Sequence, residues 1–514
     1  MSDNSANNKR IAKNTLFLYF RMLIKMLVSL YTSRVVLEYL GITDYGIYNV
    51  VGGIVTLFGF IVGPMTISVQ RFLSFELGKK ERDNTQINTI FSMAIFIHII
   101  LAIIVLFITE TVGFSLLHTL QIPIERIQIA KWVLHISIIT SCITILQIPY
   151  IGLIVAFEKM EAYAYISIVE VFLKLAIVFL LPIIPHDKLL VYAALIFFAT
   201  IITQSLYAIY CKINIKSIKL TLMWDYITFK KLFNFALWSM FGELAWSVSG
   251  QGINILLGNF FAPAINAARG IAVQVLTVLK QFVYNFQTAI NPQIIKSYAA
   301  EEINEAQKLT LNSIRLSFFL MFAISSPFLF HIDTVLTIWL KTVPEHTATF
   351  CKLAIVGILF DTLSTLLETM IKASGKIQKY QLTLSFCLIL NLPISLLLLK
   401  LNFPPECVYI VYIIISIFIV FIRLFFLDKI CGFSYQLYFK ETILPILITI
   451  PGALSIPTIL SVTIQSTSTL FTIVHFFICF ITACLSIYYL GLKKGERKVI
   501  QHKLTIKKPR KFNN

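Results

Sequence analysis

The sequence predicts an all-α polytopic integral membrane protein with about 14 transmembrane helices. Its mean hydropathy is +0.83, and 58% of its residues are hydrophobic against 13% charged, whereas soluble domains carry roughly 25% charged residues. Apolar runs of about 20 residues recur along the chain, and each can cross a hydrocarbon core of about 30 Å as a helix. Runs such as 413–422 are apolar on every side, which excludes the alternating pattern of a transmembrane β-barrel.

The apolar runs define the expected helices in chain order. These are residues 14–37, 47–71, 88–109, 129–153, 161–182, 189–211, 234–257, 266–290, 311–331, 350–371, 380–399, 406–428, 442–463 and 468–491. The first run lacks a small-residue cleavage site and contains Arg21 and Lys25, so a cleaved signal peptide is not expected.

The distribution of basic residues predicts the orientation of these helices. With the N-terminus in the cytoplasm, 28 of the 43 lysines and arginines fall in cytoplasmic loops and tails, and only Arg126, Lys188, Lys341 and Lys400 fall in outside loops. This asymmetry is the positive-inside pattern, so both termini are expected in the cytoplasm. The net charge of +18 is spread over short inner loops, which favours anionic lipid headgroups, and not nucleic acid, as the partner.

The longest basic inner connection divides the chain into six helices before it and eight after it. The expected parts are a cytoplasmic N-terminus (1–13), an N-lobe with helices 1–6 (14–211), a basic inter-lobe connection (212–233), a C-lobe with helices 7–12 (234–428), accessory helices 13 and 14 (429–491) and a basic cytoplasmic tail (492–514).

The two expected lobes begin alike, which indicates an internal repeat. Residues 34–83 read as helix, short outer loop with glycine, helix with an internal proline and charged inner loop, and residues 250–305 repeat this plan. Pro64 is expected to interrupt one helix and Pro292 to end the other. Paired halves with interrupted helices are typical of carriers that hold their substrate near the middle of the membrane.

Charged residues inside the apolar runs are the main candidates for function, because each costs about 2.5–3.5 kcal/mol at the centre of a membrane helix. Arg21 and Lys25 are four residues apart and share one helix face, so they need water or an anion between them. They predict a hydrated anion-binding cavity. Arg71, Arg315 and Arg423 lie near the ends of the expected helices, where long basic side chains usually extend to lipid headgroups.

The acidic residues allow two interpretations. Arg34 with Glu38 and Glu170 with Lys174 are opposite charges four apart, so each is expected to form a structural pair that neutralises itself. Three further acids have no partner within one helical turn, and they either hold a coupling cation or proton or pair with a basic residue on another helix. These acids are Glu243, Asp361 and Glu368.

No catalytic or metal-binding pattern is found in the sequence. His98, His118, His135 and His475 are scattered, and the eight cysteines show no C-x-x-C spacing. The amides of Gln287, Asn291 and Gln293 surround Pro292, where they either line a site or satisfy the carbonyl groups that the proline leaves free. No catalytic residue, metal or cofactor is therefore expected, apart from H⁺ or Na⁺ as a coupling ion.

Three stretches of the sequence resemble bacterial polysaccharide flippases. They are SRVVLEYLGITDYGIYNVVGGIV (33–55), NAARGIAVQV (266–275) and NFQTAINPQIIKSYA (285–299), and the resemblance extends over the whole chain in length and helix count. These flippases belong to the multidrug/oligosaccharidyl-lipid/polysaccharide (MOP) exporter superfamily. The resemblance implies a MATE-like fold, with two six-helix lobes around a central cavity and a C-terminal helix pair.

The resemblance also implies a substrate and a cellular setting. Members of the family move undecaprenyl-diphosphate-linked repeat units of O-antigen, capsule or exopolysaccharide from the inner to the outer leaflet of the bacterial inner membrane by alternating access. A polysaccharide polymerase and its chain-length machinery are expected partners. The residues expected to bind the diphosphate are Arg21 and Lys25 on helix 1 and Arg269 and Lys280 on helix 8.

Three alternatives remain open at this point. A cation-coupled multidrug exporter of the same superfamily would need unpaired acids in its cavity, whereas the buried charges here are mostly basic. A polytopic polysaccharide polymerase or glycosyltransferase would act on the same lipid-linked sugars but usually carries a large outer loop. A structural scaffold leaves the repeated lobes and buried cations unexplained.

Overall fold

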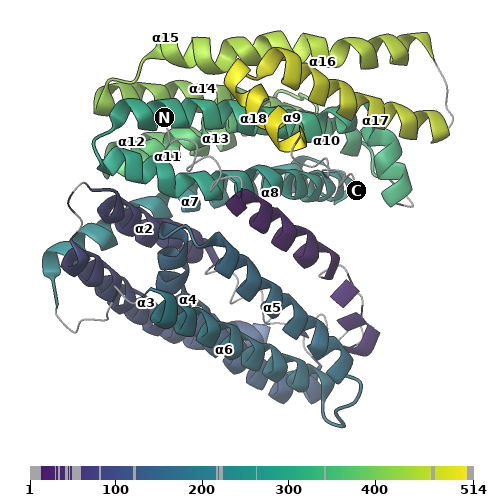
Figure 1. Ribbon diagram of the computed structural model, residues 1–514. Helices are drawn as coiled ribbons and strands as arrows, with labels where there is room; N and C mark the ends of the chain where they lie inside the picture. The colour runs from purple at the N-terminus through teal and green to yellow at the C-terminus, as the bar shows by residue number, and fades with distance from the viewer. Residues whose placement is uncertain are drawn as a thin grey trace, which may run out of the picture. The chain divides into compact units, whose positions relative to one another are not determined.

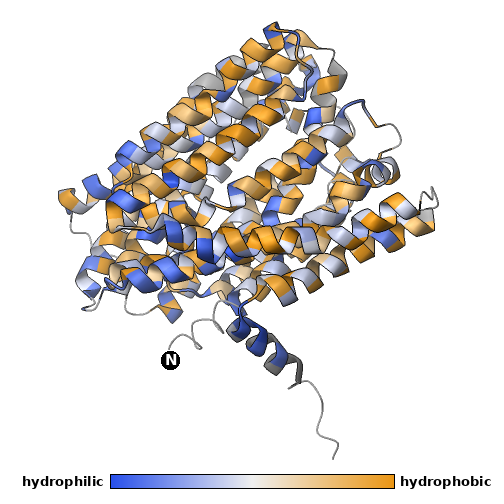
Figure 2. Cartoon of the chain, turned by 90° about the horizontal axis from the view of Figure 1, so that it is seen from above, coloured by the Kyte–Doolittle hydropathy of each residue, from blue (hydrophilic) through white to orange (hydrophobic). Residues whose placement is uncertain are grey.

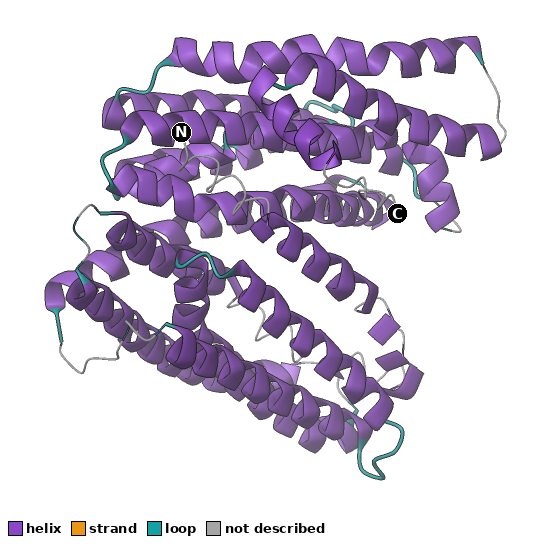
Figure 3. Ribbon diagram, in the orientation of Figure 1, coloured by secondary structure: helices purple, strands orange, loops and turns teal. Residues whose placement is uncertain are grey.

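The computed structural model describes most of the chain. The described residues are 13–28, 31–32, 35–36, 38–40, 44, 47–48, 59–79, 81, 83–119, 123–215, 218, 224–261, 263–340, 343–464 and 469–505. Every regular element within these ranges is a helix (Figures 1 and 3). The predicted all-α fold class is therefore confirmed.

The chain divides into two compact units. The first comprises Met1–Leu244, Thr288–Glu302 and Lys372–Leu382, and the second comprises Ala245–Gln287, Ile303–Ile371 and Thr383–Asn514. Two long helices contribute residues to both units, namely α7 (Tyr226–Phe260) and α8 (Pro263–Ala299). The predicted division into lobes, connection and accessory pair stays a prediction.

The first unit is built around one central helix. Residues 13–28 are helical, followed by α2 (Gly59–Gly78), α3 (Asn84–Thr119), η1 (Ile124–Arg126), α4 (Ile127–Ala156), α5 (Met160–Leu180) and α6 (Lys188–Asn214). Helix α4 packs against α2, α3, α5 and α6. Gly152 of α4 permits the close approach of α2, because a β-carbon at this position would lie 2.7 Å from Val69.

The remaining helices lie in the second unit, except that the end of α11 and the start of α12 belong to the segment Lys372–Leu382 of the first unit. They are α9 (Ile303–Trp339), α10 (Thr347–Thr362), α11 (Thr365–Ser374), α12 (Gln378–Ile389), α13 (Asn391–Lys400), α14 (Cys407–Cys431), α15 (Tyr435–Tyr438), η2 (Phe439–Ile443), α16 (Leu444–Thr463), α17 (Thr469–Ser486), η3 (Ile487–Gly491) and α18 (Lys494–Thr505). Helices α10 and α14 pack against each other, and α17 packs against α9 and α16.

Each of the 14 expected spans contains a described helix, although the first two spans fall partly on residues outside the described ranges. Ten helices of the described part are long and apolar enough to cross a membrane, and Figure 2 shows hydrophobic residues along most of the helical length. Helices α7 and α8 are not among these ten. Both contain several polar or charged residues, such as Glu243 on α7 and Lys280 on α8, which lower their hydropathy.

Several expected helix boundaries were wrong. Helix α8 continues through Pro292 to Ala299, and α2 continues through Pro64 to Gly78. Apolar length measures only the part of a helix that lies in lipid, whereas the hydrogen-bonded helix extends beyond it. A proline removes a single backbone donor, and neighbouring helices can hold the chain helical around it.

The start of α7 is stabilised by Asp225. Its carboxylate accepts hydrogen bonds from the hydroxyl of Thr228 at 2.5 Å and from the backbone N–H of Ile227 at 3.0 Å. The hydroxyl bond is the main reason why the pKa of Asp225 lies below its ordinary value. The Asp225 carboxylate thus accepts hydrogen bonds from groups in the first turn of α7, as an N-cap residue does.

Candidate functional site

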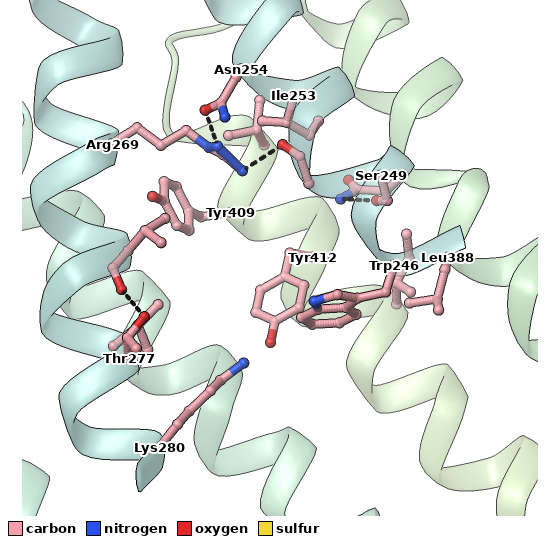
Figure 4. A pocket seen from close by; sticks show the side chains of 16 residues that line it. Trp246, Ser249, Ile253, Asn254, Arg269, Thr277, Lys280, Leu388, Tyr409 and Tyr412 are labelled. Atoms are coloured by element: carbon pink, nitrogen blue, oxygen red, sulfur yellow. Dashed lines mark hydrogen bonds between the residues drawn. The ribbon is translucent and has the colours of Figure 1, made fainter. Parts of the chain in front are cut away.

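A cavity of about 360 Å³ in the second unit brings together two of the predicted cations (Figure 4). Helices α7, α8, α12, α13 and α14 supply its lining, and Arg269 and Lys280 both lie on α8. They are eleven residues apart, which corresponds to three helical turns, so they share one face and lie about 16 Å apart along the axis. The cavity therefore has a cation toward each end of one wall.

Arg269 is held in place by two acceptors on α7. One Nη donates to the side-chain oxygen of Asn254, and the other donates to the backbone carbonyl of Gly250 at 3.1 Å. Both acceptors are neutral, so the guanidinium keeps its positive charge uncompensated by these contacts. Figure 4 shows the guanidinium extending from α8 toward the cavity wall formed by α7.

Lys280 is held by an aromatic ring and a carboxylate. Its Nζ lies 5.0 Å from the centroid of the Trp246 ring and 3.9 Å from Oδ2 of Asp361. The hydroxyl of Tyr412 donates a hydrogen bond to the same carboxylate oxygen. At 3.9 Å the ion pair is loose, and the lysine side chain is 39% exposed. An anionic ligand can therefore compete with Asp361 for the ammonium group.

Aromatic side chains form the wall between the two cations. The rings of Trp246 and Tyr412 meet edge to face at a centroid distance of 6.3 Å, and Tyr409 also lines the cavity. Indole and phenol rings combine an apolar face with a polar tip. The cavity therefore offers anion contacts at both ends and amphipathic surface between them.

The other two predicted cations lie in a basic cluster of the first unit. Arg21 and Lys25 come from the helix 13–28, and Glu170 and Lys174 come from α5. Lys174 Nζ lies 2.5 Å from Glu170, and the same carboxylate also interacts electrostatically with Lys25 and Arg21. Three cations face one carboxylate, so the cluster keeps a formal charge of +2.

Arg21 has donors that the described residues do not satisfy. Its guanidinium carbon lies 4.4 Å from the centroid of the Tyr163 ring. Its Nε and Nη1 are buried and have no hydrogen-bond partner among the described residues. A buried guanidinium donor without an acceptor costs free energy, so these two N–H groups favour water or an anionic ligand at this position.

The structure also locates the predicted ion pairs and acids. Glu170 and Lys174 make the contact that their spacing predicts, whereas Arg34 lies outside the described residues, so its pairing with the exposed Glu38 stays a prediction. Glu243 is exposed on α7. Asp361 contacts Lys280, and Glu368 lies 2.5 Å from Arg423. For Asp361 and Glu368, the interpretation as partners of basic residues on other helices is the one that these contacts support.

Three arginines that were expected to extend to lipid headgroups are buried instead. Arg71, Arg315 and Arg423 are 7%, 1% and 9% exposed. Arg71 donates to the backbone carbonyls of Lys372 and Ala373 at 3.0 and 2.7 Å. Arg315 binds Glu496, and Arg423 binds Glu368. The expectation was wrong because acceptors from distant parts of the chain meet these guanidinium groups inside the helical units.

Sequence reasoning missed the neutral residues of the cavity. The cavity is lined by Asn254, Trp246, Tyr409 and Tyr412, among others. The sequence does not single out these aromatic residues, because the chain has 43 phenylalanines, 21 tyrosines and 5 tryptophans. Aromatic residues at helical spacing are mostly core residues, so nothing local distinguishes these few. The side-chain amides near Pro292 have different partners. Gln293 donates a hydrogen bond to Glu158 at 2.8 Å, whereas the amide nitrogen of Gln287 lies 3.5 Å from the hydroxyl of Ser317.

Solved structures with a similar fold define the class of the protein. It resembles a MATE transporter in the straight conformation with a TM-score of 0.72 and 12% identity, covering 83% of this chain and 97% of that one. A multidrug resistance MATE family transporter of the MOP superfamily in an outward-facing conformation gives 0.70 and 12%, covering 82% and 96%. A MOP superfamily transporter from Pyrococcus furiosus gives the same values. The chain is thus a polytopic membrane protein with the MATE fold.

The family follows from the sequence itself. The chain belongs to the polysaccharide biosynthesis protein family, whose model it matches over residues 11–298. No curated protein matches it in sequence. The predicted membership of the polysaccharide branch of the MOP superfamily is confirmed by this match together with the fold.

Proposed function

We propose that the protein is a flippase for lipid-linked oligosaccharides. It moves the diphosphate headgroup of an undecaprenyl-diphosphate oligosaccharide from the inner to the outer leaflet of the bacterial inner membrane by alternating access. The observation that carries the proposal is the cavity with Arg269 and Lys280 on one face of α8. A diphosphate cannot enter hydrocarbon unaided, because charge removed from water without a partner is very costly, and these cations replace part of its hydration.

The sign of the buried charges favours an anionic substrate over a cationic one. Asp361 contacts Lys280, and Glu368 contacts Arg423. Because these carboxylates are already paired with basic residues, they are less available to bind a cationic drug. One structural neighbour is likewise described as having a binding pocket of reverse polarity that suggests a different function. The multidrug-exporter alternative is therefore the weaker one.

Reconstitution tests this function. The purified protein is placed in liposomes with a fluorescent undecaprenyl-diphosphate oligosaccharide, and exposure of the headgroup to an external glycosidase is recorded. We expect faster exposure than in protein-free liposomes, and we expect the mass of the lipid to stay unchanged when the glycosidase is left out. Joining of sugar units would instead indicate a polymerase or glycosyltransferase, and no exposure under any ion gradient would contradict the flippase.

The double variant Arg21→Ala with Lys25→Ala tests the basic cluster of the first unit. We expect the exposure rate to fall at least about tenfold, since each charge-assisted hydrogen bond contributes roughly 1.5–3 kcal/mol. Lys13→Ala is the matched control, because Lys13 lies on the same helix in an exposed ion pair with Glu161. Equal rates in the double variant and the control would remove the cluster from the transport path.

The contact between Lys280 and Asp361 suggests how a proton gradient is coupled to transport. A substrate phosphate that draws Lys280 away leaves the Asp361 carboxylate without its cation, and a coupling proton or cation takes the vacated place. With Asp361→Asn we expect tighter substrate binding, because Lys280 no longer has a competing carboxylate, together with loss of the response to a pH gradient. Transport of this variant is compared with and without a gradient; an unchanged gradient response would exclude Asp361 from coupling.

A further inference from the structure

Two histidines and a cysteine meet in the second unit, away from the cavity residues. His331 lies on α9, and His475 and Cys479 lie four residues apart on α17. His331 Nε2 is 2.6 Å from His475 Nδ1, and Cys479 Sγ is 3.9 Å from the same nitrogen. One ligand atom from each residue lies within 4.8 Å of the other two. The sequence predicted no metal site, since 144 residues separate the two histidines.

His475 is oriented by a backbone carbonyl. Its Nε2 lies 3.0 Å from the carbonyl oxygen of Pro457 on α16. A carbonyl can only accept, so Nε2 carries the proton, and Nδ1 directs its lone pair toward His331 and Cys479. An imidazole that donates one N–H to a carbonyl and presents the other nitrogen is typical of metal-binding histidines.

A local distortion of α9 carries the other imidazole. The backbone of His331 is non-helical, with φ −121° and ψ 20°, four residues after Pro327 inside the same helix. These dihedrals place a kink in α9 at His331 itself. His475 and Cys479 are 0% and 1% exposed, and the rings of Phe330 and Phe471 lie 5.8 and 5.5 Å from the His475 ring. Two of the three residues are therefore buried, and His331 is half-buried.

The distances are close to those around a bound metal ion. An ion held by three ligands in one plane, at about 2.0 Å by nitrogen and 2.3 Å by sulfur, places two ligand nitrogens about 3.5 Å apart and nitrogen and sulfur about 3.7 Å apart. The Cys479 sulfur already has nearly this distance from His475, and the two imidazole nitrogens need to separate by less than about 1 Å. The sulfur lies within 4.8 Å of a ring nitrogen of His331, so it needs to approach that imidazole by about 1 Å at most. Binding would move the proton of His331 from Nε2 to Nδ1 and release the thiol proton to solvent.

Charge decides which ion fits. One thiolate and two neutral imidazoles carry a charge of −1, so a monovalent ion makes the complex neutral, whereas Zn²⁺ leaves a net positive charge among apolar helices. Zn²⁺ also takes four ligands in structural sites, and the described residues group only these three. Soft sulfur ligands select Cu(I). We propose that His331, His475 and Cys479 form a three-coordinate Cu(I) site that ties α17 to α9.

Competition for Cu(I) tests the proposal. The full chain in detergent receives Cu(I) under ascorbate, and a chromophoric Cu(I) chelator then competes for the ion. We expect one ion per chain to be retained, with an affinity at least about 100-fold lower in Cys479→Ser, because loss of a residue that merely orients a ligand already costs 10–100-fold. Cys484→Ser is the matched control, since Cys484 is exposed on the same helix, and it should retain the ion fully.

X-ray absorption of the unsubstituted protein provides a test that depends on no variant. We expect one sulfur and two nitrogen neighbours around copper. Failure of the parent protein to retain Cu(I), equal retention in Cys479→Ser, equal loss in both cysteine variants, or tight binding of Zn²⁺ in place of Cu(I) would each overturn the proposal.

Discussion

Replacing Arg269 and Lys280 together with alanine should lower the rate of headgroup exposure by about 100-fold or more. Each cation is expected to make charge-assisted hydrogen bonds worth roughly 1.5–3 kcal/mol with a diphosphate. Two such losses amount to about 3–6 kcal/mol, and each 1.4 kcal/mol corresponds to a factor of ten. The rate is measured in the liposome assay described above.

The same experiment needs a control for folding. Arg269 also bonds to Asn254 and to the carbonyl of Gly250, so its removal can loosen the contact of α7 with α8. Asn254→Ala removes one of these contacts and keeps the cation, and Lys352→Ala removes a cation whose partner Asp333 is 66% exposed. We expect Lys352→Ala to transport within about threefold of the parent, and Asn254→Ala, which loosens Arg269 but keeps both cations, to lose much less than the double variant. Parental rates in the double variant would exclude the cavity as the diphosphate site.

Much of the fold could be predicted because lipid restricts the backbone. A chain that crosses hydrocarbon must satisfy its own hydrogen bonds, so each long apolar run had to be a helix. The breaks inside these runs could not be predicted. The run 350–371 contains most of α10 and most of α11, and the run 380–399 contains most of α12 and α13. Such breaks depend on packing with neighbouring helices, which hydropathy does not record.

The cations of the cavity were predictable, and their partners were not. Arg269 and Lys280 are separated by a whole number of helical turns, which sequence spacing reveals. Lys280 meets Asp361, which is 81 positions further along the chain, and Arg315 meets Glu496, which is 181 positions away. Contacts over such separations arise only from tertiary packing. For that reason the arginines assigned to lipid headgroups were misassigned. Their positions near helix ends were also wrong: Arg315, for example, lies 12 residues after the start of α9 (Ile303–Trp339).

The contact of Arg315 with Glu496 joins the described part of the C-terminal tail to α9. Helix α18 begins directly after Lys493, whose ammonium group binds the Glu441 carboxylate and lies 3.1 Å from Asn312. Glu496 accepts from Arg315 at 2.5 Å and from the backbone N–H of Lys493 at 2.8 Å. The acid thus both caps its own helix and neutralises a buried guanidinium.

Glu496→Ala should therefore destabilise the protein by about 3–5 kcal/mol, the usual cost of leaving a buried charge without its counterion. Arg315 is 1% exposed, its Nε has no partner among the described residues, and its remaining acceptor is the Glu441 carbonyl at 3.4 Å. Thermal unfolding in detergent, followed by helix content, measures the loss. Glu345→Ala, at a side chain that is 90% exposed, should change stability by less than about 0.5 kcal/mol.

A second substitution separates loss of the ion pair from loss of the helix cap. Arg315→Met combined with Glu496→Ala removes both charges and keeps an apolar side chain of similar length, and such replacements of a buried pair are often neutral or stabilising. We expect the double variant to recover most of the stability that Glu496→Ala loses. If it stays as unstable as the single variant, the cap of α18 is the main contribution of Glu496. If neither variant differs from the parent, the buried arginine does not depend on the tail.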